Sequence, residues 1–210
     1  MSDPPFRDVA GRPTERLDAA AWDARWAGGD TPWDMGGPAP PLVGALARGL
    51  VAPPGRALAV GCGAGHDARH VAAAGFDVTA IDIAPQALER ARALTPPGTP
   101  RIAFVLADLF ALPPELRDFD VVIEHTCFCA IDPGLRDAWV DAVADALRPG
   151  GLLLGLFFVF ESETGPPFGA TEEELRTRLG RRFEVLEGAR PPDSHPARAA
   201  RDFLVLARRR

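Results

Sequence analysis

Short apolar runs alternate with stretches of helical spacing along most of the chain, which is typical of a parallel sheet with crossover helices. The apolar runs predict strands at 57–60, 76–81, 102–107, 119–124, 151–159, 182–187 and 202–207. The helical spacing predicts helices at 15–27, 42–50, 66–74, 85–94, 134–147 and 172–179, with Thr14 capping the first and Pro149-Gly150-Gly151 ending the fifth. The pattern therefore predicts an α/β protein with a seven-stranded, mostly parallel sheet and right-handed crossovers.

The 210 residues, of which 47% are hydrophobic, can enclose one sizeable core. Residues 1–13 are polar and contain proline, and the stretch 28–41 is too rich in glycine and proline for regular structure. Neither an internal repeat nor a linker interrupts the pattern. We expect a single domain over 1–210, in which 1–41 form an N-terminal lid segment and 42–210 form the core.

A glycine-rich loop is the most informative local motif. The apolar run that begins at Arg56 breaks into Gly61, Gly63 and Gly65 and is followed by helix-forming alanines. Glycine there lets a ligand lie against the backbone, where any Cβ would hold it away. His66 stands where a dinucleotide-binding motif requires its third glycine, so the loop predicts a nucleotide-like ligand and disfavours a nicotinamide-dependent oxidoreductase.

Acidic residues end or follow three successive predicted strands: Asp82, Asp108 and Glu124. Because the carboxyl ends of parallel strands meet at the ligand-binding crevice of such sheets, we expect these acids to face one cavity. Asp82 has the spacing from Gly61 at which an acid accepts both hydroxyls of a ribose. Each acid could instead merely cap the turn after its strand. The combination with the glycine loop resembles a class I S-adenosylmethionine-dependent methyltransferase.

Composition excludes several classes of function. A net charge of −6 gives no electrostatic case for nucleic acid, and the longest apolar run, 152–160, is too short to span a bilayer. We therefore expect a cytoplasmic protein. Cys62, Cys127 and Cys129 are predicted to be reduced, packed thiols, and no metal site is expected. The chain contains no lysine or tyrosine, which excludes Schiff-base chemistry and a tyrosine-dependent dehydrogenase site.

Tryptophans near the N-terminus suit a cationic cofactor, because an aromatic face attracts a sulfonium. Trp22 and Trp26 are spaced to share one helix face, so they could equally form a core stripe. Trp33 lies in the glycine- and proline-rich loop and must pack on the domain or on a ligand.

Several segments together resemble the thiopurine S-methyltransferase family, and in particular its halide and thiol methyltransferase branch. The matching segments are Trp22-x3-Trp26-x-Gly28-x2-Thr31-Pro-Trp33-Asp34, Gly61-Cys-Gly-Ala-Gly-His-Asp67, Asp82-Ile, Glu124-His-Thr-Cys-Phe-Cys-Ala-Ile131, Pro149-Gly-Gly and Gly165-Pro-Pro-Phe168. The chain carries Ala59 where many methyltransferases have an acid, as that branch tends to do. The resemblance implies a Rossmann-like class I methyltransferase fold with helices on both faces of the sheet and an N-terminal helical lid.

The resemblance also implies S-adenosylmethionine as the cofactor and S-adenosylhomocysteine as its product. The implied cofactor-binding residues are Trp22, Trp26, Trp33, Gly61, Gly63, Gly65, Asp82, Ile83, Asp108, Leu109 and Glu124, and the implied acceptor-binding residues are Cys127, Phe128 and Phe158. Within this set, Asp82 would hold the ribose, Asp108 with Leu109 the adenine edge, and Glu124 the region near the methionine moiety.

The identity of the acceptor is less clearly indicated. The family's halide-binding enzymes have a tyrosine where this chain has Phe158, and often an aspartate where it has Glu124. Since Phe158 lacks a hydroxyl, an apolar thiol loses less there than a small anion. His195 lies near a histidine of the family's C-terminal loop and is a candidate base, although a lone histidine in a polar loop is also simply solvated. Whether His125 faces the pocket is open.

These observations favour a methyltransferase that transfers a methyl group to a small soft nucleophile, a thiol or a halide, by in-line displacement. One alternative is methylation of an oxygen or nitrogen of another small metabolite. A second is a non-catalytic S-adenosylmethionine-binding module. We expect a small-molecule acceptor, no membrane or nucleic-acid partner, and a monomer.

Overall fold

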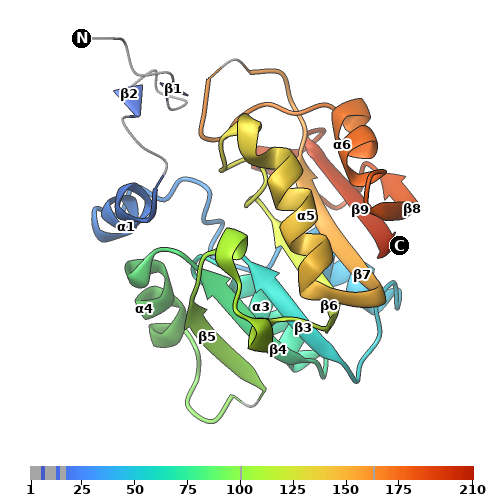
Figure 1. Cartoon of the computed structure of the whole chain (residues 1–210). Helices are drawn as coiled ribbons and strands as arrows, with labels where there is room; N and C mark the ends of the chain where they lie inside the picture. Colours follow the sequence, from blue (N-terminus) through green and yellow to red (C-terminus); the bar gives the residue numbers. More distant parts are fainter. Residues whose placement is uncertain (1–5, 8–12, 15–17, 100, 163) are drawn as a thin grey trace.

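A twisted sheet forms the centre of the computed structural model, which describes residues 6–7, 13–14, 18–99, 101–162 and 164–210. Its order is β5-β4-β3-β6-β7-β9-β8, and β9 runs antiparallel to both of its neighbours while β5, β4, β3, β6 and β7 are parallel (Figure 1). The strands are β3 Arg56–Val60, β4 Asp77–Asp82, β5 Ile102–Leu106, β6 Phe119–His125, β7 Leu147–Phe158, β8 Phe183–Ala189 and β9 Asp202–Arg209. A separate short pair joins β1 Phe6–Arg7 to β2 Pro13–Thr14. The predicted seven-stranded, mostly parallel sheet is confirmed.

Helices cover both faces of this sheet, as predicted. They are α1 Ala19–Ala27, α2 Pro40–Ala47, α3 His66–Ala73, α4 Pro85–Ala93, α5 Arg136–Ala146 and α6 Glu172–Leu179. Figure 1 shows α5 in front of the strands and α3 behind them. The short 3-10 helices are η1 Leu109–Ala111, η2 Pro114–Leu116, η3 Pro133–Leu135 and η4 Pro196–Arg198.

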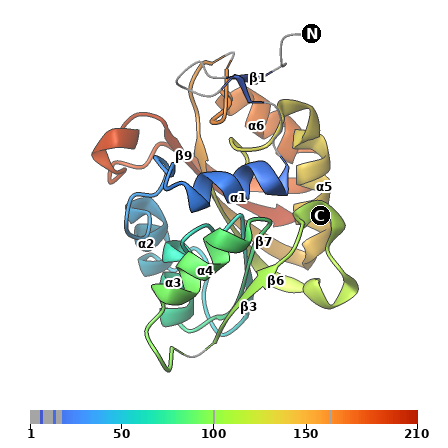
Figure 2. The ribbon, with the colours of Figure 1, turned by 90° about the vertical axis from the view of Figure 1, so that its left-hand side faces the viewer.

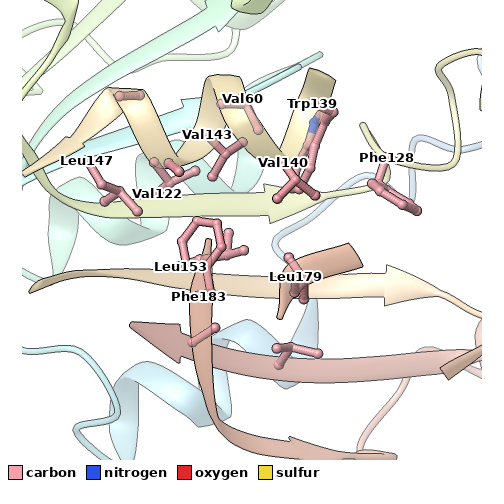
Figure 3. Close-up of a cluster of buried hydrophobic side chains, with 14 of the residues drawn as sticks. Val60, Val122, Phe128, Trp139, Val140, Val143, Leu147, Leu153, Leu179 and Phe183 are labelled. Atoms are coloured by element: carbon pink, nitrogen blue, oxygen red, sulfur yellow. The ribbon is translucent and has the colours of Figure 1, made fainter. Parts of the chain in front are cut away.

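Side chains of β3 point alternately to the two faces of the sheet and so belong to two separate core clusters. Leu58 and Val60 join the cluster under α5 and α6, whereas Ala57 and Ala59 join the cluster against α2 and α3. Successive side chains of a strand point to opposite faces, so a continuous apolar run is needed when both faces are covered. Figure 3 shows the first cluster, in which Trp139, Val140 and Val143 of α5 lie over Val122 of β6.

The structure corrects the start of the first helix. The helix predicted at 15–27 begins at Ala19, where the Asp18 carboxylate accepts the backbone N–H of Ala21 at 3.0 Å. The predicted cap, Thr14, lies in β2, and residues 15–17 fall outside the described residues. A second acceptor side chain closer to the apolar stripe thus takes the capping role.

Two further elements depart from their predicted bounds by three residues or more at one end. The helix predicted at 42–50 spans Pro40–Ala47, because proline is compatible with the first helical turn and Gly49 has a φ of +73°. The strand predicted at 151–159 already starts at Leu147, which pairs with Phe119 before a register shift. Among the described residues, no helix is both long and apolar enough to cross a membrane.

Candidate active site

A cavity of about 890 Å³ opens where β3, β4, β5 and β6 end, which is the edge at which open α/β sheets bind ligands. Its volume lies in the usual range for small-molecule sites. The predicted site residues that line it are Trp22, Trp26, Trp33, Gly61, Gly63, Asp82, Ile83, Asp108, Leu109, Cys127 and Phe158. Gly65, Glu124, Phe128 and His195 do not line it.

The glycine loop is shaped by its neighbours as well as by the cavity. Gly61 has a φ of +55°, and a Cβ there would lie 2.9 Å from the Cβ of Cys127. At Gly65 a Cβ would lie 2.8 Å from the ring of Phe104, which explains this glycine without a ligand. Gly63 borders the cavity, and its N–H donates to Asp82 at 2.9 Å. The loop is therefore held tightly against β4 and the segment after β6.

Asp82 is the best placed group for a ribose. One carboxylate oxygen accepts the N–H of Gly63 and the other accepts the N–H of Ala84, both at 2.9 Å. Each oxygen keeps a further lone pair, and the residue lines the cavity. Burial raises the pKa of this carboxyl, against three backbone N–H groups, those of Ala84, Gly63 and Ile83, that lower it. A diol that donates two hydroxyls would therefore replace the missing solvent contacts.

Asp108 both caps the turn after its strand and faces the cavity. Its carboxylate accepts the N–H of Phe110 at 2.9 Å and so caps η1. The same residue lines the cavity together with Leu106, Leu109 and Phe110. The apolar edge beside a polar acceptor suits a purine ring.

Helix α1 and the loop after it contribute three tryptophans to the lining of the cavity. The ring centres of Trp22 and Trp26 lie 5.5 and 5.9 Å from that of Trp33, edge to face. Figure 2 shows α1 lying across the molecule beside α4, and the N–H of Gln86 in α4 donates to Asp23 at 2.7 Å. The tryptophans are thus part of the cavity wall and not of the central core.

Glu124 points into the protein. It is fully buried, and one oxygen accepts the N–H of Phe128 at 2.9 Å while the other has no hydrogen-bond partner. Burial raises its pKa to about 8, so the carboxyl is mostly neutral near pH 7. Phe128 packs against Trp139 and Phe157, with ring centres 5.2 and 5.5 Å apart. Neither residue lines the cavity, although Cys127 and Cys129, the neighbours of Phe128 in the chain, do.

Replacing Glu124 by glutamine should stabilise the protein at alkaline pH. Between about pH 4.5 and 8 the folded protein holds a proton that the unfolded chain has lost, so wild-type stability falls with rising pH by at most about 5 kcal/mol. Glutamine cannot ionise and escapes this loss. The free energy of unfolding of both proteins, measured in urea from pH 5 to 8, should diverge in favour of the variant. A constant difference across that range would contradict an ionisable, buried Glu124, and Glu184→Gln is the exposed control.

Three thiols border the cavity: Cys62, Cys127 and Cys129. Burial raises all three pKa values, that of Cys129 to about 12 and the other two well above the usual range. A thiol kept protonated is a poor nucleophile. Among the described residues, no group of three or more histidines, cysteines and acids could hold a metal ion.

Sequence reasoning did not find Arg198, which lines the same cavity from η4. It is 7% exposed, and its Nη2 donates to the carbonyl of Trp33 at 3.2 Å. The guanidinium lies 5.1 Å from the ring centre of Phe158, and its Nη1 is buried without a hydrogen-bond partner. One arginine in a polar loop carries no periodic or motif signal, so only the fold reveals it.

Asp67 and His125 form a second feature that the sequence left open. The Nδ1 of His125 lies 2.7 Å from one oxygen of Asp67, and the other oxygen accepts the N–H of Ala39 at 2.7 Å. Burial alone would raise the pKa of Asp67, but His125 and this N–H outweigh it and lower the pKa. Both residues line the cavity, and the Nε2 of His125 is buried without a partner.

A small chamber of about 70 Å³ adjoins the main cavity. It is lined by Met35, Gly37, Pro38, Ala39, Pro40, Pro41, His125, His195, Arg198 and Asp202. His195 borders this chamber, and its Nδ1 accepts the N–H of Ala197 at 3.2 Å, capping η4. Asp202 is buried, which raises the pKa of its carboxyl, whereas a hydrogen bond from Ser194 and the charge of Arg198 lower it. His195, the candidate base predicted from the sequence, therefore lines the small chamber and not the main cavity.

The lining divides along the sheet edge into two halves. Asp108 follows β5 and Asp82 ends β4, next to the loop after β3. On the other side, Phe158 ends β7 and Arg198 precedes β9. The first half offers a diol acceptor, an apolar ring slot and aromatic faces, which fit an adenosine with a sulfonium attached. The second half offers an apolar wall and one buried cation.

The sheet order, the glycine loop and Asp82 define a class I S-adenosylmethionine-dependent methyltransferase. The model of the thiopurine S-methyltransferase family matches residues 17–202, and the chain belongs to that family. It is 37% identical over 206 residues to thiocyanate methyltransferase 1 of Brassica oleracea, which covers 95% of this chain and 89% of that protein. It is 34% identical over 176 residues to probable thiol methyltransferase 2 of Arabidopsis thaliana, covering 82% and 77%.

Among solved structures, the fold is similar to that of 1,6-didemethyltoxoflavin-N1-methyltransferase of Burkholderia thailandensis with bound 1,6-didemethyltoxoflavin and S-adenosylhomocysteine. The TM-score is 0.71 at 22% identity, over 91% of this chain and 86% of that one. The predicted family, fold, enzyme class and cofactor are thereby confirmed.

Proposed function

We propose that this enzyme methylates the sulfur of a small thiol or of a thiocyanate-like anion, by in-line displacement, within the half of the cavity that contains Phe158 and Arg198. The observation that carries the proposal is Arg198, a buried cation that lines the cavity together with apolar groups such as Phe158, Pro166 and Ile131. An arginine with an unpartnered Nη1 favours an acceptor that is anionic when it reacts. The printed names of the two plant relatives, a thiocyanate and a probable thiol methyltransferase, support the same acceptor class.

The bound cofactor supplies a methyl group that its positive sulfonium has already activated. The protein's own task is therefore to orient the acceptor and exclude water. Asp82 would hold the ribose, and Trp22, Trp26 and Trp33 would line the path of the cation. Arg198 would hold the anionic sulfur, whose charge is lost as the new bond forms.

Phe158 argues for sulfur over a halide. Its ring offers no hydroxyl to a small anion, and one face is covered by the guanidinium of Arg198. A halide would lose a hydrogen-bond donor there, while an organic thiol gains contact with an apolar ring.

Release of S-adenosylhomocysteine tests this proposal. Purified protein should turn over thiocyanate, hydrosulfide and an aromatic thiol faster than iodide. Arg198→Met, which keeps the length of the side chain and removes its charge, should lower kcat/KM for thiocyanate by about 10- to 100-fold. Arg201→Met is the matched control, because Arg201 also lies near Phe158 but is exposed and does not line the cavity.

Other results would redirect the assignment. Faster turnover of iodide than of any thiol would show that the missing hydroxyl is dispensable. Turnover with none of these acceptors, despite binding of the cofactor, would favour an oxygen or nitrogen acceptor or a non-catalytic binding module. Equal losses in the Arg198 and Arg201 variants would remove the assigned role of Arg198.

A further inference from the structure

We propose that His125, positioned by Asp67, is the base that removes the proton from a thiol acceptor, and that the small chamber is the exit for this proton. The inference rests on the proposed function, since it concerns acceptors that carry an S–H proton.

The geometry of the pair is that of an oriented general base. Asp67 binds Nδ1 of His125 at 2.7 Å, which assigns the ring proton to that nitrogen and leaves the lone pair of Nε2 available. Asp67 cannot rotate away, because its other oxygen is held by the N–H of Ala39. The Nε2 is buried and lacks a partner, and the residue lines the cavity that contains Phe158 and Arg198.

The other histidines are less suitable. His195 lines only the small chamber, and its Nδ1 already accepts a backbone N–H. His66 lines the main cavity, but one nitrogen lies 3.0 Å from Arg69 and the other 3.1 Å from Asp34. His70 lines neither cavity.

His125 also borders the small chamber, so it connects the two spaces. A chamber of about 70 Å³ has room for at least one water molecule. Two of the residues that line it, His125 and Arg198, carry buried nitrogen atoms, Nε2 and Nη1, that have no protein partner. A water bound to these atoms would accept the proton on its way to solvent.

The charged and titratable groups around His125 come from four segments. They are Asp34 before α2, His66 and Asp67 of α3, His195 and Arg198 at η4, and Asp202 of β9. Asp67 stabilises the imidazolium that forms, and Arg198 stabilises the thiolate left behind. The proton transfer creates a positive imidazolium beside the negative Asp67 and a negative thiolate beside the positive Arg198. Each new charge therefore lies next to a charge of opposite sign.

The electrons balance without a further reactant. The thiol S–H bond breaks, its proton moves to Nε2 of His125, and its electron pair stays on sulfur. The thiolate forms a bond to the methyl carbon, and the pair of the breaking carbon–sulfonium bond returns to the cofactor's sulfur as a thioether. His125 then gives its proton to water in the small chamber.

A comparison of two acceptors tests the role of His125. Thiocyanate has no proton to lose, whereas an alkyl thiol is mostly protonated near pH 7. In His125→Gln the ratio of kcat/KM for the thiol to kcat/KM for thiocyanate should fall by about 100-fold near pH 7. The deficit should shrink as the pH rises, because thiolate then forms in solution. His70→Gln is the matched control and should keep the wild-type ratio.

An acceptor ratio within about twofold of wild type at every pH would overturn the proposal. If the wild-type protein turned over neither acceptor, the proposed function would fail, and the role of His125 with it. Turnover of both acceptors with an unchanged ratio in the variant would instead leave the function standing and remove the base.

A second measurement does not depend on turnover. An aromatic thiol bound with S-adenosylhomocysteine cannot react, and its ultraviolet absorption reports the fraction that is ionised. The bound thiol should ionise at a pH at least about one unit lower in wild type than in His125→Gln or Asp67→Asn. The Asp67 variant retains the imidazole, so it serves if the His125 variant does not fold. Identical ionisation in wild type and variants would contradict the proposal.

Discussion

Replacing Asp82 by alanine is expected to weaken binding of S-adenosylhomocysteine by about 100-fold or more. The carboxylate lies at the end of β4, lines the cavity and retains one lone pair on each oxygen after binding the N–H groups of Gly63 and Ala84. Alanine removes both acceptors for the ribose hydroxyls. It also releases the N–H of Gly63, so the glycine loop loses its link to β4.

Isothermal titration calorimetry with S-adenosylhomocysteine measures this effect directly. Asp77→Ala is the matched control, since Asp77 stands at the opposite end of the same strand and is largely exposed. A loss below about threefold in Asp82→Ala would show that the ribose is held elsewhere.

Replacing Arg136 by methionine is expected to lower the free energy of unfolding by about 3 kcal/mol. Arg136 is 2% exposed, and its Nη1 lies 2.9 and 3.1 Å from the two carboxylate oxygens of Glu174. Its Nη2 donates to the carbonyl of Gly169 at 2.9 Å, and its guanidinium lies 4.8 Å from the ring centre of Phe128. Methionine fills the space but leaves these acceptors without their donor.

Urea unfolding of Arg136→Met and of Arg178→Met separates burial from charge. Arg178 binds the same Glu174 at 2.8 Å but is more exposed, so its loss should cost below about 1 kcal/mol. Equal costs for the two variants would show that the buried contacts of Arg136 add no stability.

Local patterns were enough to predict the sheet and most helices. The helix predicted at 172–179 has those bounds in the structure, because Thr171 caps it and Gly180 ends it. The start of α1 was wrong because two acceptor side chains, Thr14 and Asp18, precede the same apolar stripe. Capping preferences alone cannot choose between such neighbours.

The candidate site was predictable where strand ends converge and less so elsewhere. Asp82 and Asp108 line the cavity because their strands deliver them to one edge. Glu124 and His125 are adjacent on β6, and alternation sends one inward and the other toward α3. Which of the two turns inward depends on the register with β3, which no local pattern contains. Arg198 reaches the site through a long connection between β8 and β9.

The raised pKa values of Cys62, Cys127 and Cys129 bear on whether the enzyme methylates its own cysteines. An enzyme that holds an alkylating agent beside its own sulfur atoms risks inactivating itself. Distance offers no safeguard, because these cysteines border the cavity that would hold the donor. In the proposed reaction the safeguard is ionisation, since burial keeps the enzyme's own thiols protonated whereas the sulfur of the acceptor is anionic beside Arg198. The enzyme would thus distinguish its own cysteine sulfurs from the sulfur of the acceptor by their charge.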